Sequence, residues 1–315
     1  MQNSIVEKPE TRPSAMQNFK PMRFFQNFLR AAFTATVLAA CEDVVQVDVT
    51  PASAQLVVDA FLTNRDTTQT IRLTQTVPYF SEGKVPVVSN AEILLKNQAT
   101  GREFVFADTK IDGIYAWKPL GSDSIGAIGH SFQLTVRHQN ETFMAQSRLS
   151  RTTEVDSVTY GFQKTGQDPE EQKEGYYSTF YGRDAVGGRD YYWIRSYKNN
   201  AYQSRVFNFA VDGFGGETDG GDGFPFIPPL QNMTDGRNPA QVGDKVRVEI
   251  WSITRETFGF LEQAQRQITN GGLFAVTPEN VRTNLKNTNP ASKTKAVGWF
   301  CTSVVSGLEV VVKEK

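Results

Sequence analysis

The run QLVVDAFL at residues 55–62, followed by TIRLTQT at residues 70–76, sets the pattern of this chain. In the second run, apolar Ile71 and Leu73 alternate with polar residues, which is the period of two expected of a strand buried on one face. Five more short extended runs follow, separated by turns rich in Asn, Asp and Gly. About seven short strands in roughly 100 residues predict an immunoglobulin-like or transthyretin-like β-sandwich over residues 55–150.

Residues 151–315 are also rich in extended runs, which predicts a second β-rich domain and a mainly β protein. We expect one helix in this part, from about Arg255 to Thr269. Thr254 is a suitable N-cap, and Asn270-Gly271-Gly272 would end the helix. The face expected to pack on a sheet carries Phe258, Leu261, Gln265 and Ile268.

The composition narrows the function classes. The chain has 315 residues, a formal net charge of −1 and 22 Phe, so a disordered chain and a basic nucleic-acid binder are both excluded. His130 and His138 are the only histidines, and we expect both at the surface or in turns. Cys301, flanked by apolar residues, is expected to be a buried, inert thiol. No G-x-S-x-G motif is present. We therefore expect a non-enzymatic protein without a cofactor or a bound metal.

The N-terminal region has the features of an export signal. Residues 22–43 read MRFFQNFLRAAFTATVLAACED, with an uncharged run from Ala31 to Ala40. This run is too short to cross a bilayer, which takes about 20 residues. A basic flank, a short apolar core and small residues before a cysteine predict a signal peptide over residues 1–40. Leu-Ala-Ala-Cys resembles the bacterial lipobox, so Cys41 is predicted to be the lipid anchor and residues 41–54 a tether.

Three points stay open in this region. The chain could instead begin with an amphipathic helix of a cytosolic protein, with Cys41 as an ordinary thiol. Glu42 and Asp43 resemble the signal that exports Bacteroidota lipoproteins to the cell surface, and the alternative is a solvated charge pair in the tether. Translation could start at the first methionine, at Met16 or at Met22.

The segment VDGFGGETDGGDGFPF at residues 211–226 is the most unusual part of the sequence. Its glycines suit a surface loop, but a solvated loop has no need of three phenylalanines. We therefore predict that Phe214, Phe224 and Phe226 form a contact with a partner or ligand. A plain surface loop and a calcium site stay as alternatives. The acidic residues that would bind calcium are Asp212, Glu217, Asp219 and Asp222.

The order of motifs along the chain carries a family resemblance. It begins with LVVDAFLTN and IRLTQTVPYF, continues with PVVSNAEILLKNQATG, and ends with VRVEIWSIT, FLEQAQRQITNGGLF and AVGWFCTSVV. From Leu56 to Val312 the chain resembles a family of Bacteroidota outer-membrane lipoproteins of unknown function, domain-of-unknown-function family four-two-four-nine. The resemblance implies a lipid anchor and genes beside SusC-like TonB-dependent receptors. The family has no established catalytic residues to transfer.

These observations lead to a functional expectation. We expect a surface-exposed, lipid-anchored outer-membrane protein that acts as an accessory subunit, either ligand-binding or a lid, of a TonB-dependent transporter. Its partner would be a SusC-like receptor. The alternative is a structural or assembly lipoprotein associated with another outer-membrane complex. A hydrolase is the weakest of the three readings. The residues do not identify a ligand.

Overall fold

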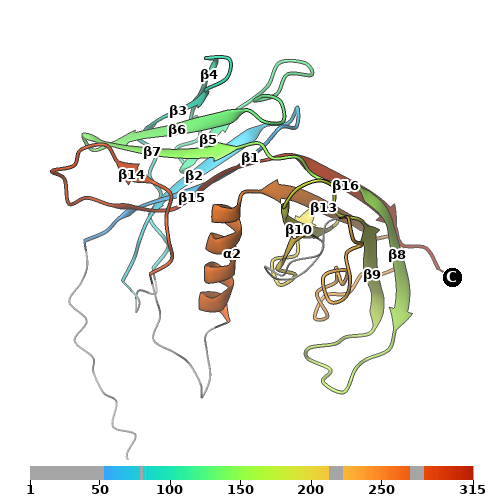
Figure 1. Ribbon diagram of the computed structural model, residues 1–315. Helices are drawn as coiled ribbons and strands as arrows, with labels where there is room; N and C mark the ends of the chain where they lie inside the picture. The colour runs from blue at the N-terminus through green and yellow to red at the C-terminus, as the bar shows by residue number, and fades with distance from the viewer. Residues whose placement is uncertain (1–52, 79–80, 82, 213–222, 270–279, 315) are drawn as a thin grey trace, which may run out of the picture. The chain divides into compact units, whose positions relative to one another are not determined.

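The structure is a computed structural model that describes residues 53–78, 81, 83–212, 223–269 and 280–314. In this part of the chain, strands dominate and one helix, α2 (Arg255–Ile268), accompanies them, which confirms the predicted mainly β fold (Figure 1). The strands are β1 (Leu56–Thr63), β2 (Gln69–Gln75), β3 (Glu92–Asn97), β4 (Glu103–Phe106), β5 (Ile114–Trp117), β6 (Ser131–His138), β7 (Glu141–Arg148), β8 (Val155–Gln163), β9 (Gly175–Gly182), β10 (Tyr191–Lys198), β11 (Ala201–Tyr202), β12 (Asn208–Val211), β13 (Lys245–Ile253), β14 (Lys286–Asn287), β15 (Ala296–Ser303) and β16 (Val305–Val311).

Two sheets enclose the first hydrophobic core. One has the strand order β15-β1-β2-β5, and the other has the order β14-β7-β6-β3-β4. Alternate residues of β1 point into this core, as the period of two requires. They are Leu56, Val58, Ala60 and Leu62. Buried residues from both sheets complete the core, so this part of the chain is a β-sandwich, as predicted.

The C-terminal strands return to this sandwich. β15 pairs in parallel with β1 along its whole length, from Leu56 opposite Ala296 to Thr63 opposite Ser303. β14 pairs with β7, and Phe300 of β15 is fully buried in the first core. The chain beyond residue 151 therefore supplies one strand to each sheet of the sandwich predicted for residues 55–150. Because of these pairings, Ala52–Lys315 forms one compact unit.

A further sheet has the order β11-β10-β13-β16, and β12 also pairs with β10. Its strands alternate between two faces. On one face, Tyr192, Ile194 and Ile250 form a second core together with residues of the β8–β9 hairpin. On the other face, aromatic residues of β10, β12, β13 and β15 pack with α2. The helix thus covers one face of the sheet, as expected.

The N-terminus of α2 matches the prediction, but the last turn of the helix is less buried than expected. Thr254 is the N-cap, because its Oγ1 accepts a hydrogen bond from the Thr257 N–H at 3.2 Å. Phe258 and Leu261 are buried, but Ile268 is 77% exposed. The prediction for Ile268 was therefore wrong, because the last turn of α2 is not covered by the described residues of the sheet. The described part of the chain contains no helix with the length and apolar character needed to cross a membrane.

Candidate functional site

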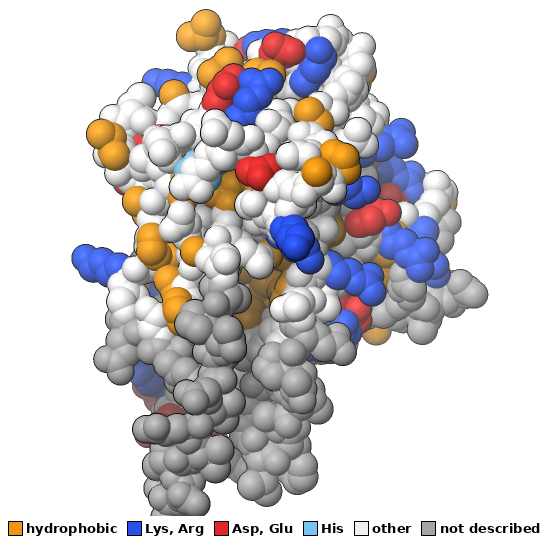
Figure 2. Space-filling view, turned by 90° about the vertical axis from the view of Figure 1, so that its left-hand side faces the viewer, with side chains coloured by type: hydrophobic (Ala, Val, Ile, Leu, Met, Phe, Trp, Pro, Cys, Tyr) orange, Lys and Arg blue, Asp and Glu red, His pale blue; other side chains and the backbone are white. Residues whose placement is uncertain are grey.

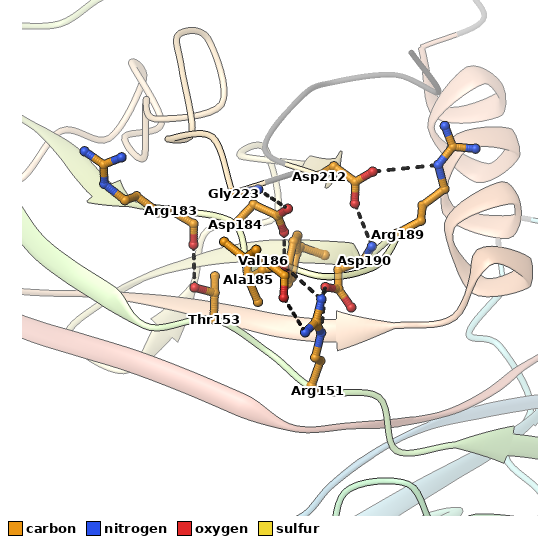
Figure 3. Close-up of polar contacts among 11 residues, drawn as sticks. Arg151, Thr153, Arg183, Asp184, Ala185, Val186, Arg189, Asp190, Asp212 and Gly223 are labelled. Atoms are coloured by element: carbon orange, nitrogen blue, oxygen red, sulfur yellow. Dashed lines mark hydrogen bonds and ion pairs between the residues drawn. The ribbon is translucent and has the colours of Figure 1, made fainter. Parts of the chain in front are cut away.

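The predicted contact loop is held at both of its ends. Its residues 213–222, including Phe214, lie outside the described residues. The flanking residues Asp212 and Gly223 follow β12 and precede the bridge between Arg183 and Pro225. Both flanks contact the turn between the end of β9 and the start of β10 (Figure 3). We call Arg151, Asp184, Asp190 and Asp212 the loop anchor.

Asp212 and Asp190 bind each other's backbone. The Asp190 N–H donates to Asp212 Oδ1 at 2.7 Å, and the Asp212 N–H donates to the Asp190 carbonyl at 3.0 Å. Asp212 has a left-handed φ of 45°, which Asp tolerates better than most residues. Arg189 Nε lies 3.7 Å from the second carboxylate oxygen of Asp212. The first end of the loop therefore leaves β12 in a fixed direction.

Asp184 holds the other end of the loop. Its Oδ2 accepts a hydrogen bond from the Gly223 N–H at 3.1 Å, and its Oδ1 accepts one from the Tyr192 hydroxyl at 2.6 Å. Burial raises the pKa of the Asp184 carboxyl, and these two hydrogen bonds act against that effect. The neighbouring carboxylates of Asp212 and Asp190 add to the rise, so the pKa lies above its ordinary value.

Arg151 ties the anchor to the turn between β9 and β10. Its Nε donates to Asp190 at 2.8 Å, and its Nη1 and Nη2 donate to the carbonyls of Val186 and Ala185, each at 2.8 Å. The hydrogen bond with Asp190 raises the pKa of Arg151, which favours the charged guanidinium. Figure 3 shows the guanidinium lying among these acceptors, while the Arg183 side chain points away from them.

The polar groups of the loop anchor are bonded to one another and to the backbone of the fold. Each of its three carboxylates already accepts a hydrogen bond or pairs with an arginine. Among the described residues, no group of three or more His, Cys, Asp or Glu side chains is arranged to hold a metal ion. The calcium alternative also needs Glu217, Asp219 and Asp222, which lie outside the described residues. The anchor therefore fixes where the loop leaves the fold.

The two described phenylalanines of the loop differ in their environment. Phe226 is fully buried in the second core, with its ring 5.4 Å from that of Phe180 and 5.5 Å from that of Tyr192. A contact role therefore does not hold for Phe226, which is a core residue. Phe224 is 53% exposed. Val186 is exposed as well and lies against Gly223, so close that a Cβ on Gly223 would stand 2.8 Å from its methyl carbon.

Exposed apolar side chains thus surround the described end of the loop. Val186 is 75% exposed, Phe224 is 53% exposed and Ile227 is 43% exposed. We call these three residues the apolar rim. They lie beside the charged loop anchor on a firmly held backbone, because the Asp184 N–H donates to the Phe224 carbonyl at 2.9 Å. Exposed apolar side chains that gather on an ordered backbone are a feature of contact surfaces.

The remaining predicted residues lie in different parts of the chain. Cys41, Glu42 and Asp43 lie outside the described residues. Cys301 is a fully buried free thiol, as predicted. His138 is buried, contrary to its predicted surface position. It follows Val136 by two residues in β6, so alternation turns its ring inward, and burial lowers the pKa of the imidazole.

A charged and aromatic cluster was missed by the sequence reasoning. The guanidinium carbon of Arg195 lies 4.3 Å from the ring centre of Tyr202 and 4.5 Å from those of Trp193 and Trp251. These distances indicate cation–π contacts in a partly desolvated place. Burial raises the pKa of the nearby Tyr197 to about 12. The alternation of residues 191–198, YYWIRSYK, was the signal that could have placed Arg195 on the aromatic face.

The comparisons with known proteins place this mainly β chain in a family. A family model described as a domain of unknown function (DUF4249) matches residues 42–308. The chain belongs to this family, and the match confirms the resemblance seen in the motifs. A search among curated proteins found no match.

Proposed function

We propose that this chain is a non-enzymatic, lipid-anchored accessory subunit of a SusC-like TonB-dependent transporter, exposed on the outer membrane. In this role it acts as a ligand-binding or lid subunit and contacts the transporter through the apolar rim. Cys41 carries the lipid, and Glu42 and Asp43 direct the protein to the cell surface.

The apolar rim is the observation that carries the contact. Val186, Phe224 and Ile227 expose apolar surface, while Arg151, Asp184 and Asp190 hold the backbone beneath them. A surface that is already ordered loses little conformational entropy when a partner binds, so more of the apolar burial appears as affinity. The membrane and transporter parts of the proposal are supported by the family resemblance and the lipobox-like sequence.

A pull-down from detergent-solubilised outer membrane tests the proposal. The variant exchanges the rim residues by Val186→Ser, Phe224→Ser and Ile227→Ser. The matched control exchanges three exposed apolar residues elsewhere, by Val105→Ser, Leu120→Ser and Ile128→Ser. We expect a TonB-dependent receptor to co-purify with the wild type and the control, and its yield to fall about tenfold or more with the rim variant.

Two outcomes contradict the proposal. If the rim variant keeps its melting temperature and recovers the receptor at the wild-type yield, the rim is not the contact. If the wild type brings down a barrel-assembly complex without a receptor, the structural or assembly role replaces the transporter role.

A further inference from the structure

A cavity separate from the loop anchor lies between the helix and the C-terminal strands. It has a volume of about 710 Å³ and is bounded by α2, by residues 280–287, by the start of β15 and by Gln55. Figure 2 shows the face of the molecule on which these elements lie, with hydrophobic side chains on the floor of a hollow. The volume falls within the range of about 300–1,000 Å³ that is typical of small-molecule sites.

The walls of this cavity are mostly apolar. The apolar residues that line it are Phe260, Ala264, Val281, Leu285, Ala296 and Val297. Phe260 is fixed in place, because its ring stacks on Trp299 with centres 4.6 Å apart and planes 15° apart. Trp299 is itself held by a hydrogen bond from its Nε1 to Thr257 Oγ1 at 3.0 Å. One wall is therefore rigid before any ligand arrives.

Two amide side chains fix the position of residues 280–284, which form another wall of the cavity. Gln263 of α2 accepts the Arg282 N–H at 2.8 Å and donates to the Asn280 carbonyl at 3.3 Å. Asn284 pairs with both backbone groups of Phe300, accepting from its N–H at 3.0 Å and donating to its carbonyl at 2.7 Å. Residues 280–284 are thus held between α2 and β15, so the cavity is preformed.

The charged residues among the described lining of the cavity are both cations. Arg282 and Lys295 line it, and both are exposed. No Asp or Glu is among the lining residues that belong to the described part of the chain. Neither cation forms an ion pair with another residue of the described part of the chain. An apolar cavity with two exposed cations in its described lining suits a ligand that combines an apolar body with an anionic head.

We propose that this cavity binds a single-chain amphiphile with a carboxylate head, such as a medium- or long-chain fatty acid. The alkyl chain packs against Phe260, Ala264 and the apolar residues of β15. The carboxylate lies at the border near Lys295 and Arg282, where Asn280 and Thr283 also line the cavity. This site is independent of the proposed transporter contact, since the two share no residue.

Calorimetric titration of dodecanoate, kept below its micelle concentration, tests the charge preference. The protein is the full chain carrying Cys41→Ser, which prevents acylation at this position and allows purification without detergent. We expect saturable binding of one dodecanoate per chain. Dodecyltrimethylammonium has the same chain length and the opposite charge, and we expect it to bind at least about tenfold more weakly.

Variants locate the site. Ala264→Phe fills the cavity from α2 and should abolish binding, and Lys295→Glu should weaken it about tenfold or more. Lys293→Glu makes the same charge change two residues away at a position that does not line the cavity, so it should keep most of the affinity. Melting curves show which variants are folded. If Ala264→Phe does not fold, the comparison of Lys295→Glu with Lys293→Glu tests whether the cavity binds dodecanoate.

The proposal is overturned by any of three results. Dodecanoate and dodecyltrimethylammonium bind equally well, or neither binds. Lys295→Glu and Lys293→Glu weaken binding to the same extent. A folded Ala264→Phe variant binds dodecanoate with the wild-type affinity.

Discussion

Arg65 and Glu249 are 184 residues apart in sequence and form an ion pair in the fold, with Arg65 Nη1 donating to Glu249 Oε1 at 2.7 Å. Arg65 follows β1 of the first sandwich, and Glu249 lies in β13 of the second sheet. The Glu249 side chain is only 2% exposed, and its other oxygen accepts a hydrogen bond from Trp251 Nε1 at 2.8 Å. The Glu249 carboxylate therefore links the end of β1 to the sheet that contains β13. Its burial is tolerated because both of its oxygens accept hydrogen bonds.

The pair has space because residue 307 is a glycine. A Cβ at Gly307 would stand 3.0 Å from a side-chain carbon of Glu249 and 3.4 Å from Arg65 Nη2. β16 thus passes close to the ion pair without displacing it. Arg247 adds a second positive charge, with its Nε 3.2 Å from Glu249 Oε1.

We predict that Glu249→Gln lowers the free energy of unfolding by about 3 kcal/mol at pH 7, because it removes one partner of a buried pair. Burial acts to raise the pKa of Glu249, but hydrogen bonds from Trp251 and Arg65 outweigh it, so the pKa lies below its ordinary value. The stabilisation is thus complete above the unfolded pKa of about 4.3 and is lost as the pH falls through the folded pKa. Urea denaturation at pH 7 and pH 3 measures both effects.

Glu103→Gln is the control for this prediction. Glu103 pairs with Lys96 at 3.2 Å on an exposed surface, so its replacement should cost no more than about 0.5 kcal/mol. Equal losses for the two variants, or a Glu249→Gln loss that is the same at pH 7 and pH 3, would contradict the role assigned to Glu249.

We predict that Gly298→Ala is among the most harmful single methyl additions in the chain. Gly298 has a φ of +97°, and a Cβ there would stand 2.1 Å from the Val58 carbonyl oxygen. β15 and β1 would have to separate at their pairing, which should cost about 4 kcal/mol. Gly101→Ala is the control, because Gly101 also has a positive φ but open space around it. Its cost should be only about 1–2 kcal/mol. Thermal melting that ranks the two variants equally would refute the steric argument.

Local patterns were sufficient for the strands and the start of the helix. Ile71 and Leu73 alternate with polar residues, and both are fully buried in β2. Thr254 has the side chain and position of an N-cap, and it caps α2. In each case the sequence pattern that predicts the element spans only a few residues, because strand alternation and helix capping depend on neighbouring residues.

The parallel pairing of β15 with β1 has no such local signal. Residues 296–303 form a buried strand whose apolar residues face two different parts of the fold. Phe300 packs in the first core, and Trp299 packs among the aromatic residues that contact α2. Nothing in AVGWFCTS states which strand it will join, because pairing over such a sequence distance depends on the whole topology. The sequence therefore predicted the strand and not its partner.

The candidate site was predictable only in part for a similar reason. Residues 211–226 stood out by composition, but composition cannot separate Phe224 from Phe226. The Phe226 N–H donates to the Gly182 carbonyl, so this residue continues the edge of the β8–β9 hairpin and turns its ring into the core. Asp184 reaches Gly223 from the turn between β9 and β10, and Arg151 supports this turn from the segment between β7 and β8. The sequence has no local signal for this convergence.

We predict that Arg151→Lys loosens the turn between β9 and β10. Lysine has one compact ammonium group, so it cannot hold Asp190 and the carbonyls of Ala185 and Val186 together as the planar guanidinium does. We expect a loss of about 1–2 kcal/mol and faster amide hydrogen exchange in residues 184–190. Arg183→Lys is the control, because the Arg183 side chain points away from the anchor (Figure 3). Unchanged exchange in the Arg151→Lys protein would mean that the anchor does not hold the turn.

We predict that Cys41→Ser abolishes acylation and leaves either an unprocessed precursor or a form released from the membrane. A lipoprotein carries two or three acyl chains, enough for stable attachment, whereas one chain anchors only marginally. Metabolic labelling with a palmitate analogue measures the change. Cys301→Ala removes the buried thiol and should leave labelling intact. If the Cys41→Ser protein is labelled as strongly as the wild type, the anchor lies elsewhere.

The last prediction concerns the side of the membrane on which the protein lies. Glu42 and Asp43 follow the predicted lipidated cysteine directly, and their negative charges are the feature that resembles a surface-export signal. Replacing both with alanine should keep the protein acylated and folded but retain it on the inner side of the outer membrane. Protease treatment of intact cells measures this, since a surface protein is cleaved and a retained one is protected. Asp48→Ala is the matched control, because it removes a negative charge from the same predicted tether at a distance from Cys41, and it should leave the protein cleavable. Protection of the wild type would refute surface exposure itself. Cleavage of the double variant at the wild-type rate would show that the protein reaches the surface without Glu42 and Asp43.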